Sequence, residues 1–134
     1  KEIWQELNYT EILNDHHLND VFVNIHELEW NRELHLGDHF IFKKLDQPIQ
    51  EVELKAGYFD LVYFDAFNPD LEPQLWTEEL FTKIYTAMNN YSLLTTYSTK
   101  GVVKRAMKSS GFTLEKKPGP PGKREILNAV KSII

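Results

Sequence analysis

Cysteine is missing from the 134-residue sequence, and long apolar runs are missing as well. Without cysteine the chain can form no disulfide scaffold, no cysteine-based zinc site and no thiol nucleophile. No hydrophobic stretch reaches the length of a membrane span, and no signal peptide follows Lys1. We therefore expect a cytoplasmic protein with no membrane partner.

Glycine and histidine are present, but they lack the spacings that bind phosphates or metals. None of the six glycines forms a G-x-G pattern after a strand, so the sequence has no glycine-rich loop for a nucleotide cofactor. Among the five histidines, His35 and His39 are four residues apart, but they flank the turn signal Gly37-Asp38 instead of sharing one helix face. We therefore expect no metal site.

The composition is that of a folded domain with an uneven distribution of charge. Hydrophobic residues make up 42% and aromatic residues 13% of the chain, enough for one domain with its own core. Residues 1–98 carry 18 acidic and 6 basic side chains, a balance of −12, whereas residues 99–134 carry 2 acidic and 9 basic ones, a balance of +7. A basic segment on an acidic body suits a polyanionic partner. The alternative is that these lysines are ordinary solvated residues on exposed helices.

The hydrophobic pattern of the second half predicts an α/β fold. Residues 59–64 form a nearly continuous apolar run, as in a strand that is covered on both faces. Further strands are predicted over 91–97, 112–117 and 125–130, with helices over 77–89 and 99–110. This alternation predicts a mostly parallel sheet. Only a short loop joins the last two strands, so we expect them to pair antiparallel.

The first half is harder to interpret. Residues 1–14 have the apolar spacing of a helix, and residues 18–37 show no clear pattern. Residues 32–45 are predicted to form a hairpin that turns at Gly37-Asp38. A short helix is predicted over 47–55.

Candidate chemistry lies where predicted strands end. Asp65 follows strand 59–64, and ligands of parallel sheets bind at the carboxyl ends of their strands. A carboxylate there can accept a hydrogen bond from an amine or take its proton, although capping of the next turn is the alternative. Asp46 ends another predicted strand. Phe67, Pro69 and Trp76 offer an apolar wall for a flat ligand, while core packing is the alternative for Trp76.

The run from Tyr63 to Pro69, which reads YFDAFNP, is followed by Pro73-Gln74-Leu75-Trp76-Thr77. In this order and spacing the two segments resemble the MnmC-type tRNA methyltransferase family. The resemblance extends over about residues 38–130 and includes the segments Thr95–Ser98, Val102–Arg105, Gly111–Phe112 and Lys123–Glu125.

The resemblance implies a fold and a reaction. The fold is the C-terminal part of a Rossmann-like class I methyltransferase sheet, here one partial domain over 1–134, with a lead-in over 1–37 and the late strands and helices over 38–134. S-adenosylmethionine would be the methyl donor and the aminomethyl group of a tRNA wobble uridine the acceptor. Asp65 matches the acidic residue next to the reacting groups, and Asp46 the one on the cofactor side. Phe67 is expected to contact the cofactor, and the residues expected to contact the tRNA substrate are Pro69, Trp76, Lys104, Arg105, Lys123 and Arg124.

Two parts of the family pattern are absent from these residues: the strand with the glycine loop, and the acidic residue that binds the ribose. We expect both before Lys1 in a parent protein, so that this chain alone is inactive and binds no S-adenosylmethionine. The oxidase domain of the bifunctional members is absent too.

The missing first strand has a consequence for strand 59–64, which would lack a partner on one side. Either residues 39–45 move in beside it, or two chains pair there as a homodimer. Two other functions stay open from the residues alone: another nucleotide-cofactor Rossmann enzyme, such as a dehydrogenase half, and a non-catalytic RNA-binding or interaction module.

Overall fold

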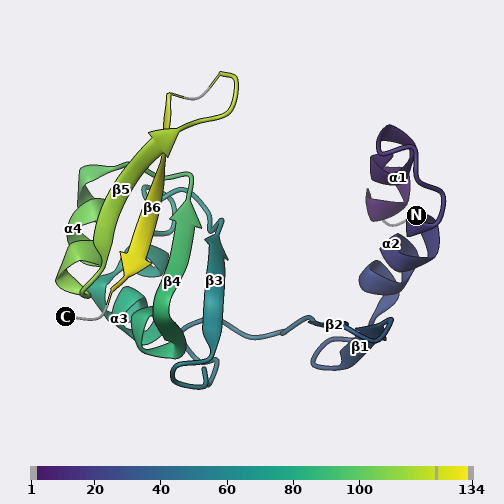
Figure 1. Ribbon diagram of the computed structural model, residues 1–134, viewed down its shortest axis with the longest axis horizontal. Coiled ribbons are helices and arrows are strands. Elements are labelled where there is room, and N and C mark those ends of the chain that lie inside the picture. The colour runs from purple at the N-terminus through teal and green to yellow at the C-terminus, as the bar shows by residue number, and fades with distance from the viewer. Residues whose placement is uncertain (1–2, 123, 133–134) are drawn as a thin grey trace. The chain divides into compact units, whose positions relative to one another are not determined.

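The computed structural model describes residues 3–122 and 124–132, and the chain divides into two compact units, Lys1–Glu51 and Val52–Ile134. The first unit contains short helices and one hairpin (Figure 1). Its elements are η1 (Ile3–Glu6), α1 (Tyr9–Ile12), α2 (Leu18–Glu27), β1 (Glu33–Leu36) and β2 (Phe40–Lys43). β1 and β2 pair antiparallel, and Gly37 in their turn has a φ of 68°. The predicted hairpin is confirmed, with glycine where the backbone is left-handed.

Aromatic rings pack against one another in the first unit. The ring of His26 stacks on Trp4 with 5.0 Å between centroids and lies 4.3 Å from the ring of Phe22. Ile3 and Ile12, by contrast, are 83% and 71% exposed. The predicted helix over 1–14 is wrong: it is divided into η1 and α1, of four residues each. Its apolar face has little to pack against, and short helices without tertiary support are marginal.

The predicted short helix over 47–55 is also wrong. Pro48 begins a single turn, in which the N–H of Glu51 donates to the Pro48 carbonyl at 2.9 Å. The boundary between the two units falls directly after Glu51, and Val52 is buried in the second unit. Ile49 and Val52 have helical spacing, but they belong to different units and therefore do not share one helix face.

The second unit is a four-stranded sheet with two helices. Its elements are β3 (Phe59–Phe64), η2 (Pro73–Trp76), α3 (Glu78–Ala87), β4 (Met88–Thr96), α4 (Gly101–Ser109), β5 (Thr113–Pro118) and β6 (Glu125–Lys131). The strand order is β3-β4-β6-β5. β3 and β4 pair parallel, and β6 pairs antiparallel with both β4 and β5. Three strands thus run in one direction and β6 runs against them, which confirms the Rossmann-like α/β class and the antiparallel final pair.

Helices α3 and α4 both lie on one face of this sheet (Figure 1). Thr77 caps α3, because its hydroxyl oxygen accepts from the N–H of Leu80 at 3.2 Å. Val102 is 51% exposed, whereas Val103 takes the inward position of α4. Side chains from both helices and the sheet form the core, among them Leu80, Phe81, Ile84, Leu94, Val103, Met107, Leu127 and Ala129.

β3 is an edge strand, with β4 as its partner in the described part of the chain. The expectation that residues 39–45 move in beside it is wrong, because β2 forms a separate sheet with β1. The turn at Gly37 folds β2 back on its own neighbour, which satisfies its backbone groups locally. Pairing of β3 with a second chain stays a prediction.

Candidate active site at the carboxyl ends of β3 and β4

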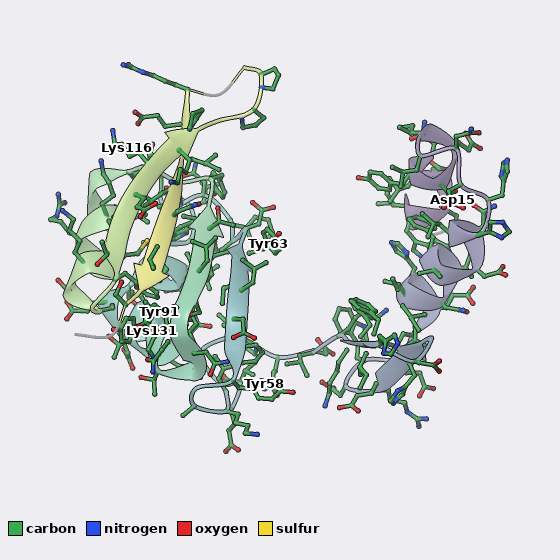
Figure 2. All side chains as sticks on the ribbon, in the orientation of Figure 1. Asp15, Tyr58, Tyr63, Tyr91, Lys116 and Lys131 are labelled. Carbon is green, nitrogen blue, oxygen red and sulfur yellow. The ribbon has the colours of Figure 1, made fainter. Side chains whose placement is uncertain are left out.

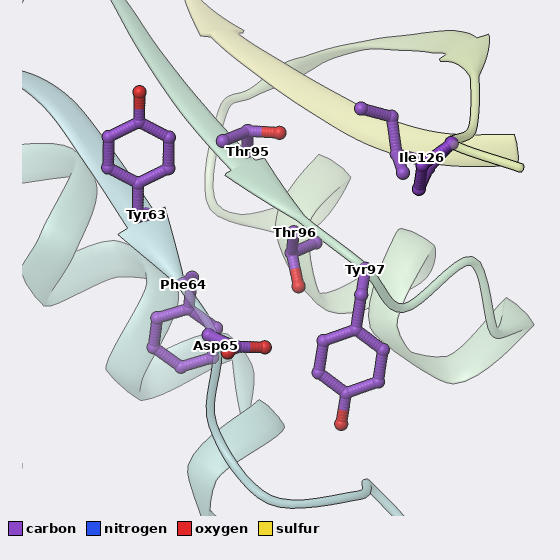
Figure 3. A pocket seen from close by; sticks show the side chains of 8 residues that line it. Tyr63, Phe64, Asp65, Thr95, Thr96, Tyr97 and Ile126 are labelled. Carbon is purple, nitrogen blue, oxygen red and sulfur yellow. The ribbon is translucent and has the colours of Figure 1, made fainter. Parts of the chain in front are cut away.

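A cavity of about 320 Å³ opens where β3 and β4 end (Figure 3). The last pair in their ladder joins Phe64 to Thr96, so Asp65 and Tyr97 are the next residues on neighbouring strands. Sequence reasoning placed Asp65 at this end of the sheet, and the structure agrees. Eight residues line the cavity: Tyr63, Phe64, Asp65, Thr95, Thr96, Tyr97, Pro120 and Ile126.

The cavity combines one carboxylate with mostly aromatic and aliphatic surroundings. Asp65 is its only charged lining residue, and its exposed side chain has no hydrogen bond or ion pair within residues 3–122 and 124–132. Pro120 and Ile126 come from the β5–β6 hairpin, which therefore forms one wall. Such a site suits a cationic or amine-bearing group held against apolar surfaces.

The apolar residues after Asp65 divide into two kinds. Phe67 is 75% exposed and available to a ligand. Pro69 is buried, and Trp76 is only 3% exposed, with its ring edge-on to that of Phe64 at 5.1 Å. The structure therefore favours the packing alternative for Trp76 and corrects the expectation that its ring contacts a substrate. The cause is that η2 turns the indole inward, where its Nε1 donates to the Phe67 carbonyl at 2.8 Å.

Asp46 lies in the first unit, in the segment after β2. Its side chain is exposed, and its backbone N–H donates to the side-chain oxygen of Asn31 at 3.2 Å. Asp46 and Asp65 belong to different units, and the role of Asp46 on the cofactor side stays a prediction.

The predicted basic residues are distributed over α4 and the β5–β6 hairpin. Lys104 is half-buried on α4, whereas Arg105 and Arg124 are exposed. Lys123 lies outside the described residues. Sequence reasoning did not single out Lys116 and Lys117 on β5, although their place in the basic segment was a signal for them. Figure 2 shows Lys116 and Tyr63 toward the carboxyl ends of their strands.

Glu125 connects several of these cations. Lys116 contacts its carboxylate at 2.8 Å, and this hydrogen bond lowers the pKa of Glu125 below its usual 4.5. Partial desolvation opposes the shift, while the charges of Lys116, Arg124 and Lys104 favour it. We call Lys104, Lys116, Lys117 and Arg124 the basic cluster. A surface hollow of about 300 Å³ lies beside it, lined by Lys116, Lys117, Pro118, Arg124 and Glu125.

Two kinds of feature are not found in the described part of the chain. No group of three or more metal-ligating side chains occurs among residues 3–122 and 124–132. Within the same residues, no helix has both the length and the apolar character needed to cross a membrane.

The chain is similar to proteins of known type along nearly its whole length. The MnmC bifunctional protein of tRNA 5-methylaminomethyl-2-thiouridine biosynthesis from Pseudoalteromonas translucida is 28% identical over 133 residues, which cover 92% of this chain and 18% of that protein. Its counterpart from Chromohalobacter salexigens is 32% identical over 95 residues, covering 71% and 12%. The chain spans between 10% and 18% of the length of the curated relatives it matches.

A solved structure supports the fold, and a family model supports the assignment. The crystal structure of MnmC2 from Aquifex aeolicus superposes with a TM-score of 0.67 at 22% identity, covering 86% of this chain and 38% of that one. The family model of S-adenosyl-L-methionine-dependent methyltransferases matches residues 7–132, which include both units and the site at Asp65. The chain therefore belongs to the S-adenosyl-L-methionine-dependent methyltransferase family.

Proposed function

We propose that the protein carrying this chain methylates the aminomethyl group of a tRNA wobble uridine. The observation that carries the proposal is the lone carboxylate of Asp65, in a mostly apolar cavity at the strand ends of a methyltransferase fold. The names of the relatives, which concern tRNA 5-methylaminomethyl-2-thiouridine biosynthesis, supply the substrate class. Its place of action would be the cytoplasm.

Asp65 would act on the acceptor amine. An alkylamine is protonated at neutral pH and has no free electron pair for attack, so the site must bind it and favour its neutral form in the reactive geometry. The Asp65 carboxylate can attract the ammonium, accept its proton and hold the remaining N–H group. When bound, S-adenosylmethionine supplies the electrophilic methyl group on a sulfonium centre.

The residues present suit only one end of that cofactor. The carboxylate and the exposed aromatic ring of Phe67 can attract a sulfonium cation. Among the residues that the structure describes, no glycine-rich turn and no basic side chain lines the cavity to bind the ribose or the amino acid end. We infer that the rest of the cofactor site belongs to a preceding segment of a longer protein and that this chain alone neither binds S-adenosylmethionine nor transfers methyl groups. Calorimetric titration of this chain and of the longer protein would test this.

The tRNA would contact the basic cluster together with Arg105 and Lys123. Cations on α4 and the β5–β6 hairpin suit the phosphate backbone of an RNA. Because Pro120 of the same hairpin lines the cavity, a nucleotide bound along the cluster would approach Asp65. Family membership does not support the alternative of a dehydrogenase half. A non-catalytic RNA-binding module is an outcome of the test below.

The test is methyl transfer by the full-length protein to tRNA that carries the aminomethyl nucleoside, measured by mass spectrometry of digested tRNA. Asp65→Asn preserves size and removes the charge, and the rate should fall at least about a hundredfold. Asp60→Asn is the matched control, because Asp60 lies on β3 and is exposed, and an asparagine oxygen can still accept from Asn89. Binding of tRNA without any methylation by the native protein would support the RNA-binding module.

A further inference from the structure

The loop that follows Asp65 is held by side chains from outside it. The phenol of Tyr97 donates a hydrogen bond to the carbonyl oxygen of Ala66 at 2.9 Å. The next carbonyl, that of Phe67, accepts from Nε1 of Trp76 at 2.8 Å. Two successive peptide groups are therefore fixed by donors from two places, the end of β4 and η2.

The rest of the loop is fixed as well. Lys100, directly before α4, donates to the side-chain oxygen of Asn68 at 3.2 Å and forms an ion pair with Asp70. The carbonyl oxygen of Asn68 accepts from the N–H groups of Leu71 and Glu72 at 2.8 and 3.0 Å. Three successive carbonyls of the loop, those of Ala66, Phe67 and Asn68, thus have donors within the protein, which makes the loop a held support and not a freely moving cover.

Tyr97 is the anchor nearest to the candidate catalytic group. Phe64 precedes Asp65 and pairs with Thr96 of β4. Ala66 follows Asp65, and its carbonyl accepts the hydrogen bond from Tyr97. Asp65 is therefore the one residue between two fixed peptide groups. The Tyr97 ring is held in turn by an edge-on contact with Trp76, with 5.9 Å between centroids.

Figure 3 shows how these side chains lie. Asp65 and Tyr97 are next to each other at the strand ends, and the hydroxyl of Tyr97 points in the opposite direction from that of Tyr63. We propose that Tyr97 is a positioning residue: its hydroxyl fixes the Ala66 carbonyl and thereby holds the Asp65 carboxylate in place within the cavity. This inference rests on the proposed function, in which Asp65 binds the acceptor amine.

The first test compares two tyrosines in the full-length protein, one on β4 and one directly after it. Tyr97→Phe removes only the hydroxyl, and Tyr91→Phe does the same on an exposed residue, 78% accessible, near the other end of β4. Because a small displacement of a reacting group is costly, Tyr97→Phe should lower kcat about tenfold and leave the KM for S-adenosylmethionine unchanged. Tyr91→Phe should change neither. A raised KM with normal kcat would contradict the proposal.

The second test asks whether Tyr97 acts through Asp65. In the Asp65→Asn background the positioned charge is already gone, so adding Tyr97→Phe should cause no further loss of kcat. The same tenfold loss in that background would overturn the inference, because it would mean that Tyr97 contacts the substrate or acts by another route.

A third measurement does not depend on activity. Amide hydrogen exchange over residues 65–72 should be faster in Tyr97→Phe than in Tyr91→Phe, and equal exchange in the two variants would contradict the proposal. If the native protein transfers no methyl group to tRNA, the proposed function fails. If the native protein transfers methyl groups, Asp65→Asn lowers the rate and Tyr97→Phe leaves the rate unchanged, only the inference about Tyr97 fails.

Discussion

Lys131 at the end of β6 is joined to Tyr85 of α3 in two ways. Its ammonium donates a hydrogen bond to the Tyr85 carbonyl at 2.8 Å and lies 4.6 Å from the centre of the Tyr85 ring. It also donates to the Met88 carbonyl at 2.7 Å. One cation thus satisfies two carbonyls near the C-terminus of α3, where the helix dipole favours positive charge.

Removal of this cation should destabilise the second unit. Lys131→Gln leaves the carbonyls of Tyr85 and Met88 without a charged donor, which should cost about 1–2 kcal/mol. We expect the Tm in thermal unfolding to fall by several degrees. The control is Lys108→Gln on α4, an exposed lysine with no described partner, which should leave Tm unchanged. Equal Tm values for the two variants would show that the Lys131 contacts contribute nothing.

The ion pair between Lys116 and Glu125 should make stability depend on pH in the acid range. The pKa of Glu125 is lower in the folded chain than its usual 4.5, chiefly because of the hydrogen bond from Lys116. Its stabilising contribution is therefore complete above the unfolded pKa and is lost as the pH falls through the folded one. Glu125→Gln should lower Tm at neutral pH, and its difference from the native chain should be smaller at about pH 3. A difference that is the same at both pH values would contradict this.

The basic cluster should control RNA affinity through phosphate contacts. Replacement of the whole cluster, together with Arg105 and Lys123, by alanine in the full-length protein should weaken tRNA binding by at least about tenfold and flatten its dependence on salt. Lys55→Ala combined with Lys83→Ala removes cations from the acidic part of the chain and serves as the control. The measurement is the slope of log affinity against log salt concentration. If that slope is the same for both variants, the cluster does not bind the phosphates.

The exposed edge of β3 should cause self-association of this chain when it is studied alone. An apolar strand without a partner on one side is a template for another chain. Light scattering at high concentration should give about twice the mass of the 15.8 kDa chain. Leu61→Lys on β3 should favour the monomer, whereas Thr113→Lys on β5, at the other edge, should not. A native chain that remains monomeric contradicts the pairing.

Local patterns in the sequence predicted the second unit well. The apolar run 59–64 and the apolar spacing over 77–89 and 99–110 depend only on neighbouring residues, so β3, α3 and α4 lie close to their predicted positions. The place of Asp65 follows from the same reasoning, because it depends only on where one strand ends.

The features that the sequence did not predict depend on contacts between residues that are far apart in the chain. No local pattern says that β6 pairs with β4 as well as with β5, or that Trp76 is buried by Phe64 and Tyr97. The division after Glu51 is equally hidden, since Ile49 and Val52 have helical spacing but belong to different units. The role of Tyr97 depends on a hydrogen bond to Ala66, 31 residues earlier.

The order in which the strands are made differs from their order in space. β6 is made after β4 and β5, yet it lies between them in the sheet. Until it arrives, β4 and β5 lack the strand that joins them, and β4 offers an open edge to other nascent chains. Loss of residues 125–131 would therefore remove an inner strand and divide the sheet into two parts, whereas loss of an edge strand would leave one smaller sheet. A premature stop codon just before Glu125 should consequently be far more damaging than its distance from Asp65 in the sequence suggests.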